Sequence, residues 1–125
     1  MQLKFSGNRP VYIQIMEQVR SAIVTGELPP GGRVPPVRDL AAQAQVNPNT
    51  MQRAMLELER EGLVIAKGTL GRFVTEDPET LQTMRQTARD AVIRECAAQL
   101  KAAGIPIAQA VQMLLALNEE EENHG

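Results

Sequence analysis

Aromatic residues are almost absent from this chain. Its 125 residues include no tryptophan, one tyrosine and two phenylalanines, while 43% of the residues are hydrophobic. A buried core must therefore consist of aliphatic side chains and methionine. The single tyrosine, Tyr12, is expected to pack in the core or as a helix staple rather than to stack on a base. A chain of this size predicts one small domain or a domain with an extension, and it would bury more surface with a partner chain.

Cysteine and histidine are equally scarce, with Cys96 and His124 as the single examples. One cysteine excludes an internal disulfide and agrees with a reducing cytoplasm. The two residues have no partners at metal-ligand spacing, so we predict a buried thiol at Cys96, no metal and no cofactor. The chain also lacks a phosphate-binding glycine loop and a close carboxylate pair in apolar surroundings, which disfavours an enzyme.

Long hydrophobic runs are missing as well. No apolar stretch approaches the roughly 18 residues that cross a membrane. The first residues also lack a basic region followed by an apolar one, the pattern of a targeting segment. These absences predict a soluble, cytoplasmic protein without a membrane partner.

The net charge of −2 hides an uneven distribution. Residues 1–75 carry nine basic and six acidic side chains, whereas residues 76–125 carry four and nine. This asymmetry favours a cationic working domain with an acidic appendage. The alternative is that the glutamates at 119–122 create most of the difference, so charge alone does not decide whether nucleic acid is the partner.

The hydrophobic pattern predicts three helices in the first half of the chain. Residues 11–25 carry apolar side chains at helical spacing, whereas four prolines and three glycines exclude a helix from residues 26–36. A short helix from about 36 to 43 and a turn at 45–46 lead into a helix over 48–61. Two short helices joined by a tight turn form a helix-turn-helix.

The helix over 48–61 has the features of a DNA-recognition helix. Asn47 is a suitable N-cap, Pro48 fits the first helical position, and Gly62 follows as a C′ glycine. One side is an apolar stripe of Met51, Ala54, Met55 and Leu58. The other side presents Asn49, Thr50, Gln52 and Arg53. Amide, hydroxyl and guanidinium groups are the types that hydrogen-bond to base edges and phosphates.

A β-hairpin is predicted directly after this helix. Residues 63–66 and 72–75 have the composition of strands, and residues 67–71 that of a turn. A hairpin after a helix-turn-helix is a wing, and Lys67 and Arg72 flank its tip with positive charge. The turn glycines allow close approach to another backbone or simply serve the hairpin geometry, and both can hold.

Two further helices are predicted at 79–103 and about 107–118. Two helices in so short a tail have little to bury against, so we predict a homodimer in which the hairpins of two protomers pack together. Residues 119–125 are predicted to be a frayed acidic tail. The candidate dimerisation residues are Leu81, Met84, Ala88, Val92, Cys96, Leu100, Val111 and Leu114.

Residues 10–75 resemble the winged helix-turn-helix of the GntR family of bacterial transcription regulators. The resemblance is carried by PVYIQIMEQVRSAIVTGELPPGGRVPPVRDLAAQAQVNPNTMQRAMLELEREGLV and the later GRFV. The short tail and the VNPNT motif are similar to the YtrA-like subfamily, whose tail serves dimerisation. The resemblance implies a mainly α fold with a small β wing, a DNA-binding domain over 1–76 and a two-helix dimerisation domain over 77–125.

The resemblance also implies particular DNA contacts. Arg38 matches a family arginine that precedes the recognition helix and reaches DNA, with a salt bridge to Glu17 or at its own helix end as the alternative. Gly71 with Arg72 matches the wing that enters the minor groove. Arg53 lies next to a contacting position, with a solvated charge as its alternative. The candidate DNA-binding residues are Arg38, Asn47, Asn49, Thr50, Gln52, Arg53, Lys67, Thr69, Gly71 and Arg72.

Four positions depart from the family pattern. Pro36 replaces a capping serine, which costs roughly 1 kcal/mol. Gln45 replaces the usual turn glycine, and Thr69 the first wing glycine. Pro48 stands where other subfamilies have a base-contacting arginine, so sequence recognition would depend more on the amide side chains of the helix.

Together these patterns favour a homodimeric repressor of a palindromic operator in double-stranded DNA, with the helix over 48–61 in the major groove and the wing over 67–72 in the minor groove. A small-molecule effector is compatible, and the small tail would place it at an interface. The alternative is a winged-helix protein-interaction module without DNA binding. An acidic recognition face would support that alternative, but the acids Glu57, Glu59 and Glu61 lie in the second half of the helix.

Overall fold

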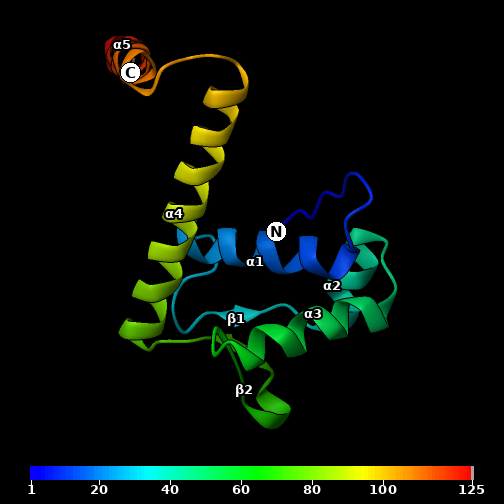
Figure 1. Ribbon diagram of the computed structural model, residues 1–125. Coiled ribbons are helices and arrows are strands. Elements are labelled where there is room, and N and C mark those ends of the chain that lie inside the picture. The colour runs from blue at the N-terminus through cyan, green and yellow to red at the C-terminus, as the bar shows by residue number, and fades with distance from the viewer. Residues whose placement is uncertain (125) are drawn as a thin grey trace. The chain divides into compact units, whose positions relative to one another are not determined.

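The computed structural model describes residues 1–124 and divides into two compact units (Figure 1). The first unit comprises residues 1–86 and the second begins at residue 87. As predicted, the fold is mainly helical, with a winged helix-turn-helix followed by two C-terminal helices. The boundary between the units lies ten residues beyond the expected limit of the DNA-binding domain at residue 76.

The first unit contains the three predicted helices. They are α1 (Val11–Thr25), α2 (Val37–Ala44) and α3 (Pro48–Arg60). Gly62 follows α3 with φ of 77°, and the N–H of Leu63 donates to the carbonyl of Leu58 at 3.1 Å. This pattern is the helix ending that a C′ glycine allows, because a left-handed residue is needed there.

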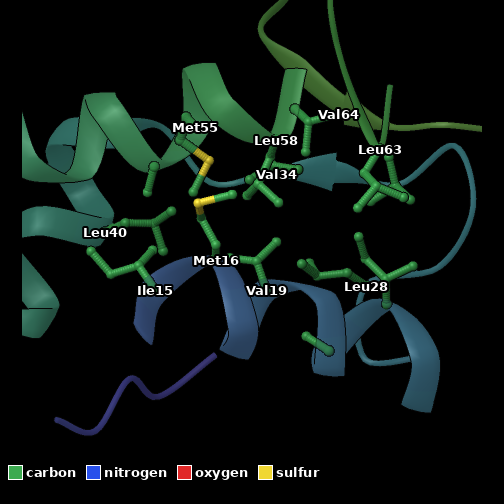
Figure 2. Packing of buried hydrophobic residues seen from close by; sticks show 14 of the residues in the cluster. Ile15, Met16, Val19, Leu28, Val34, Leu40, Met55, Leu58, Leu63 and Val64 are labelled. Atoms are coloured by element: carbon green, nitrogen blue, oxygen red, sulfur yellow. The ribbon is translucent and has the colours of Figure 1, made fainter. Parts of the chain in front are cut away.

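The core of the first unit is aliphatic, as the shortage of aromatic residues predicted. Figure 2 shows Met55 and Leu58 of α3 pointing toward Met16 and Val19 of α1. Packing of α1 along α3 forms the centre of the unit, and α2 packs against α3 beside it. The side chains that are essentially inaccessible to solvent are Ile15, Val19, Ile23, Val34, Leu40, Met51, Met55, Leu58, Val64 and Val74.

The wing is one strand larger than predicted. The sheet has the order β1-β3-β2 and is antiparallel. Its outer strands are β1 (Arg33–Val34) and β2 (Val64–Ala66), and its central strand is β3 (Arg72–Val74). A 3-10 turn, Gly68–Leu70, connects β2 to β3. The unpredicted strand β1 forms inside the proline-rich connector because residues 31–34 can pair with β3.

Two glutamines of α1 hold the N-terminal residues. The side-chain amide of Gln18 exchanges hydrogen bonds with the backbone of Lys4 at 2.8 and 2.7 Å. The side chain of Gln14 does the same with Ser6 at 3.0 Å. Each side-chain amide supplies one donor and one acceptor, so it satisfies the backbone N–H and C=O of one residue, as a neighbouring strand would.

Helix α4 (Pro78–Ala102) begins in the first unit and continues into the second from residue 87 on. The second unit also contains α5 (Ile107–His124). Gly104 separates the helices with φ of 73°. The expected frayed tail is wrong for residues 119–124, which continue α5, while Gly125 lies outside the described residues. Glutamate is a good helix former, and the Asn118 side chain donates to Glu122 at 3.3 Å along the helix.

Within residues 1–124, no single helix is long and apolar enough to cross a membrane; α4 and α5 reach that length and composition only together, across a sharp bend. The same residues contain no group of three histidine, cysteine or acidic side chains arranged to hold a metal ion.

Candidate nucleic-acid interface

The start of α3 is fixed by its own sequence. The side-chain oxygen of Asn47 accepts a hydrogen bond from the backbone N–H of Asn49 at 2.8 Å. Pro48 occupies the first helical position, where no N–H is needed. The predicted cap is therefore confirmed. The first turn carries no acidic side chain, and Asn47 and Asn49 are both exposed.

The exposed side of α3 is polar at its start, while Leu56 further along is an exposed apolar residue of that side. The predicted apolar stripe of α3 is fully buried and consists of Met51, Ala54, Met55 and Leu58. Asn49 and Arg53, four residues apart, share the opposite side and are exposed. Thr50 and Gln52 are half-buried at the two edges of that side. Four of the predicted DNA-contacting side chains are thus gathered on one surface.

The glutamates in the second half of α3 are neutralised by arginines. Three ion pairs form, Glu57–Arg60, Glu59–Arg72 and Glu61–Arg20. The more exposed pairs, Glu57–Arg60 and Glu61–Arg20, contribute only about 0–1 kcal/mol each to stability. Their consequence for the surface is larger, because α3 does not present the unpaired acidic face that would have supported a protein-interaction module.

The turn before α3 depends on a non-glycine residue in a left-handed conformation. Gln45 has φ of 56° and is the single non-glycine residue with positive φ between residues 1 and 124. The following N–H of Val46 donates to the carbonyl of Ala41 at 3.0 Å. Gln45 therefore performs the task of the turn glycine that it replaces, at a conformational cost of roughly 1 kcal/mol.

Arg38 lies in the first turn of α2 and is exposed. Neither alternative partner engages it, since Glu17 pairs with Arg9 and Arg38 forms no ion pair within residues 1–124. Pro36 precedes α2 and, as predicted, forms no side-chain hydrogen bond that caps this helix. Arg38 thus presents an intact charge beside α3.

The wing is tied to α3 by a half-buried ion pair. The Nε of Arg72 donates to the carboxylate of Glu59 at 2.6 Å, and the two side chains are 22% and 23% exposed. Part of the Arg72 charge is therefore used within the unit. Lys67 lies over the ring of Phe73, 4.9 Å from its centroid, and Thr69 is exposed in the 3-10 turn.

Sequence reasoning missed Arg33 as a wing residue. Gly71 has φ of 106°, and a Cβ there would lie 3.2 Å from the Arg33 Nε. The absence of a side chain at Gly71 thus lets the Arg33 side chain lie beside the turn of the hairpin. Arg33 is exposed. Together with Arg72 and Pro36 it lines a cavity of about 310 Å³ between β1, the start of α2 and the hairpin formed by β2 and β3. The sequence feature that could have indicated Arg33 is its positive charge in the 26–36 connector. It was not recognised because strand β1 was not predicted there.

Arg53 has a partner that the sequence did not predict. Its guanidinium carbon lies 3.8 Å from the centroid of the Tyr12 ring. Tyr12 is half-buried and packs against the core, as expected of a core or staple residue. Arg53 is thus neither a freely solvated charge nor part of an ion pair, because an aromatic face supports it.

The candidate dimerisation residues fall into two groups. Leu81 and Met84 are 5% and 7% exposed and belong to the core of the first unit, so they are already covered within one chain. Ala88, Cys96 and Leu100 are half-buried. By contrast, Val92, Val111 and Leu114 are exposed.

A short α2, a tight turn, a capped polar α3 and an arginine-bearing hairpin define a winged helix-turn-helix. Comparison with known families then identifies the particular group. Residues 11–74 match the bacterial regulatory proteins of the gntR family. The chain belongs to this family, and it is a helix-turn-helix DNA-binding transcriptional regulator rather than an enzyme.

The most informative relatives have similar lengths. The chain is 35% identical over 105 residues to YhcF of Bacillus subtilis, an uncharacterized HTH-type transcriptional regulator, covering 84% of this chain and 87% of that one. It is also 35% identical over 80 residues to the HTH-type transcriptional repressor YtrA of the same organism, covering 64% and 62%. The chain is therefore YtrA-like, as the sequence motif indicated.

Solved structures show the same fold. A GntR family transcriptional regulator from Listeria monocytogenes superposes with a TM-score of 0.81 at 27% identity, covering 90% of this chain and 98% of that chain. The DNA-binding domain of AraR in complex with operator ORX1 superposes with a TM-score of 0.55 at 28% identity, covering 60% and 99%.

Proposed function

We propose that this protein is a homodimeric repressor that binds a palindromic operator. The observation that carries the proposal is the capped, acid-free first turn of α3, which exposes amide and guanidinium groups. Two named similarities support it, since YtrA is a transcriptional repressor and the AraR domain is bound to an operator. The protein would act in the bacterial cytoplasm, where its DNA lies.

Specificity would come from the exposed side of α3 in the major groove. Asn49 and Gln52 can each form two hydrogen bonds with adenine, worth about 1–3 kcal/mol of discrimination per base. Thr50, at the edge of that side, suits a phosphate contact, and so does the N-cap residue Asn47. Because Pro48 has no long side chain, these amides would carry most of the base recognition.

The wing would add contacts in the minor groove. Lys67, Thr69 and Gly71 lie at or beside its tip, and the Arg33 side chain lies against Gly71 and lines the same cavity as Arg72. Positive side chains near the minor groove gain from its negative potential. Since Arg72 is held by Glu59, we assign the larger phosphate contribution to Arg33.

Dimerisation would use the second unit. Large apolar side chains are exposed along the second half of α4 and along α5, among them Val92, Ile93, Val111, Leu114 and Leu117. A second copy of this chain would cover these side chains, with Ala88, Cys96 and Leu100 near the centre. The two α3 helices would then contact half-sites about one DNA turn, ~34 Å, apart.

The test is binding to a duplex from upstream of the protein's own gene, measured by fluorescence anisotropy across salt beside a random duplex. We expect tight binding to the upstream duplex, a steep negative salt slope and a preference of about a thousandfold or more. Equal weak binding to both duplexes would contradict an operator upstream of this gene. Absence of binding to either at low salt would favour the protein-interaction module instead.

Arg38→Ala provides the sharper variant. We expect operator affinity to fall about tenfold or more, because one charged contact to DNA is lost. The melting temperature should not change, since the Arg38 side chain is exposed and forms no ion pair in residues 1–124. Unchanged affinity would remove Arg38 from the interface.

A further inference from the structure

The stacked pair of Arg53 and Tyr12 differs from every other arginine contact around α3. Arg20, Arg60 and Arg72 each meet a glutamate of α3 or its end. Arg53 instead lies over the Tyr12 ring at 3.8 Å and forms no ion pair within residues 1–124. A carboxylate cancels the charge that it orients, whereas an aromatic ring orients a guanidinium and leaves its charge intact.

Stacking also leaves the hydrogen-bond donors available. The guanidinium is planar, and its N–H groups point outward from the edge of the plane. With one face against the ring of Tyr12, the edge donors remain free for a second partner. The half-buried ring is itself fixed by the core, so the plane of Arg53 is set before that partner arrives.

The position of Arg53 on α3 indicates the partner. Arg53 is one turn after Asn49 on the exposed side, but its contact with Tyr12 draws its head toward α1. A side chain at the edge of a helix that lies in the major groove meets the wall of the groove, which consists of phosphates. The favoured ligand is therefore a phosphate oxygen rather than a base.

We infer that Arg53 binds a DNA phosphate and that Tyr12 is the positioning residue that holds its guanidinium for this contact. The inference rests on the proposed function, since it requires α3 to lie in the major groove. It adds a residue of α1 to the interface and gives this single tyrosine a role beyond packing. The pair supplies affinity that is independent of DNA sequence.

The experiment uses the full chain and a mixed-sequence duplex of about 25 base pairs, long enough for two half-sites. Dissociation constants are measured by anisotropy from about 50 to 200 mM salt. The variants are Arg53→Gln, Arg53→Lys, Tyr12→Leu, Tyr12→Phe and the double variant Tyr12→Leu with Arg53→Gln. Arg94→Gln is the matched control, because it removes the same charge from an ion pair on α4. Thermal melting accompanies each variant.

We expect Arg53→Gln to reduce the salt slope by about two, one for each protomer of the bound dimer, while Arg94→Gln does not. Arg53→Lys should keep the slope but weaken binding roughly two- to fivefold, because an ammonium lacks the planar stack. Tyr12→Leu should weaken binding by a similar factor when Arg53 is present and have no further effect on the Arg53→Gln protein. Tyr12→Phe, which keeps the ring, should bind like the original protein.

An unchanged slope in Arg53→Gln would overturn the phosphate contact. Equal losses from Tyr12→Leu with and without Arg53 would reduce Tyr12 to a packing residue. If Tyr12→Leu does not fold, the salt slope of Arg53→Gln still tests the phosphate contact. The affinity of Arg53→Lys then tests the stack on Tyr12, because unchanged affinity would show that the ring does not position the guanidinium. Absence of salt-dependent binding by the unaltered protein would contradict the proposed function itself, and is thereby distinguished from failure of the pair alone.

Discussion

The two units of this protein bury their apolar side chains in different ways. Helices and wing of the first unit close around one aliphatic core, and its exposed large apolar residues are four scattered ones, Val11, Leu56, Ile65 and Leu70. In the described part of the second unit, Ala110 is the one buried hydrophobic residue, whereas eight large apolar side chains are exposed. The first unit therefore has a closed core of its own, whereas most large apolar side chains of the second stay exposed, as the proposed dimer requires.

The largest expected effect on stability comes from a buried leucine of the first unit, which is compared with an exposed leucine of the second. Leu58 is inaccessible and Leu114 is 55% exposed. Leu58→Ala should lower the free energy of unfolding by about 2–5 kcal/mol, because it leaves a cavity in a closed core. Leu114→Ala should instead weaken dimerisation. Thermal melting over roughly a hundredfold range of protein concentration separates the two effects. Only a loss of dimerisation changes how the melting temperature depends on concentration.

The contrast fails if both leucine variants show the same dependence on protein concentration. That result would mean either that the first unit is also part of the dimer interface or that α5 is not. The matched exchange of leucine for alanine excludes a difference in the deleted atoms as the cause.

Gly71→Ala tests whether the wing needs its unusual backbone. Gly71 has φ of 106° and ψ of −160°, a region that is essentially restricted to glycine, so alanine should cost about 1–3 kcal/mol. The hairpin would distort beside Arg33, and operator affinity should fall. Gly68→Ala is the comparison: its φ of 57° also strains an alanine, but no atom lies within 4 Å of its Cβ position, so it lacks the contact with Arg33. Equal effects of the two substitutions would contradict a special requirement at Gly71.

Gln45→Gly should stabilise the first unit by about 1 kcal/mol, because glycine adopts the left-handed turn conformation without a Cβ clash. Gln43→Gly, two residues earlier inside α2, should destabilise it by a similar amount, since glycine is unfavourable in a helix. Chemical denaturation measures both. A loss of stability in Gln45→Gly would show that the glutamine side chain contributes something that the backbone does not explain.

The smallest effect concerns the start of α4. The side-chain hydroxyl of Thr80, and then its backbone N–H, donate to Asp77 and hold the pKa of that carboxyl below its usual value of 3.8. A lowered pKa means that this contribution to stability is present above the unfolded pKa and is lost as pH falls through the folded one. Thr80→Val should bring the pKa of Asp77 back toward its usual value, as seen by NMR titration. No change would exclude the hydroxyl as the main cause.

Local chemistry made most of the first unit predictable. Asn47, Pro48 and Gly62 specify the limits of α3, and helical spacing specifies its buried stripe. The strand β1 was missed because two residues between prolines form a strand only by pairing with β3, about 40 residues later. The helical continuation of α5 was missed because chain ends commonly fray, although each of the four consecutive glutamates favours a helix.

Contacts between elements were the less predictable part of the site. Periodicity identified Leu81 and Met84 as apolar positions, but it could not show that they pack into the core of the first unit. The same limit applies to Arg53 and Tyr12, which lie 41 positions apart in the sequence. A pattern along one helix indicates which side is buried, and only the assembled fold supplies the partner.

The central claim is that the first unit binds DNA and the second joins two chains. Sedimentation velocity of the complex with the upstream duplex tests this claim directly, for the full chain and for a chain that ends at Gln86 and so keeps its core. We predict two protomers per duplex for the full chain, and a monomer that binds roughly a hundredfold more weakly for the shortened chain. A shortened chain that remains dimeric and binds with unchanged affinity would contradict the account.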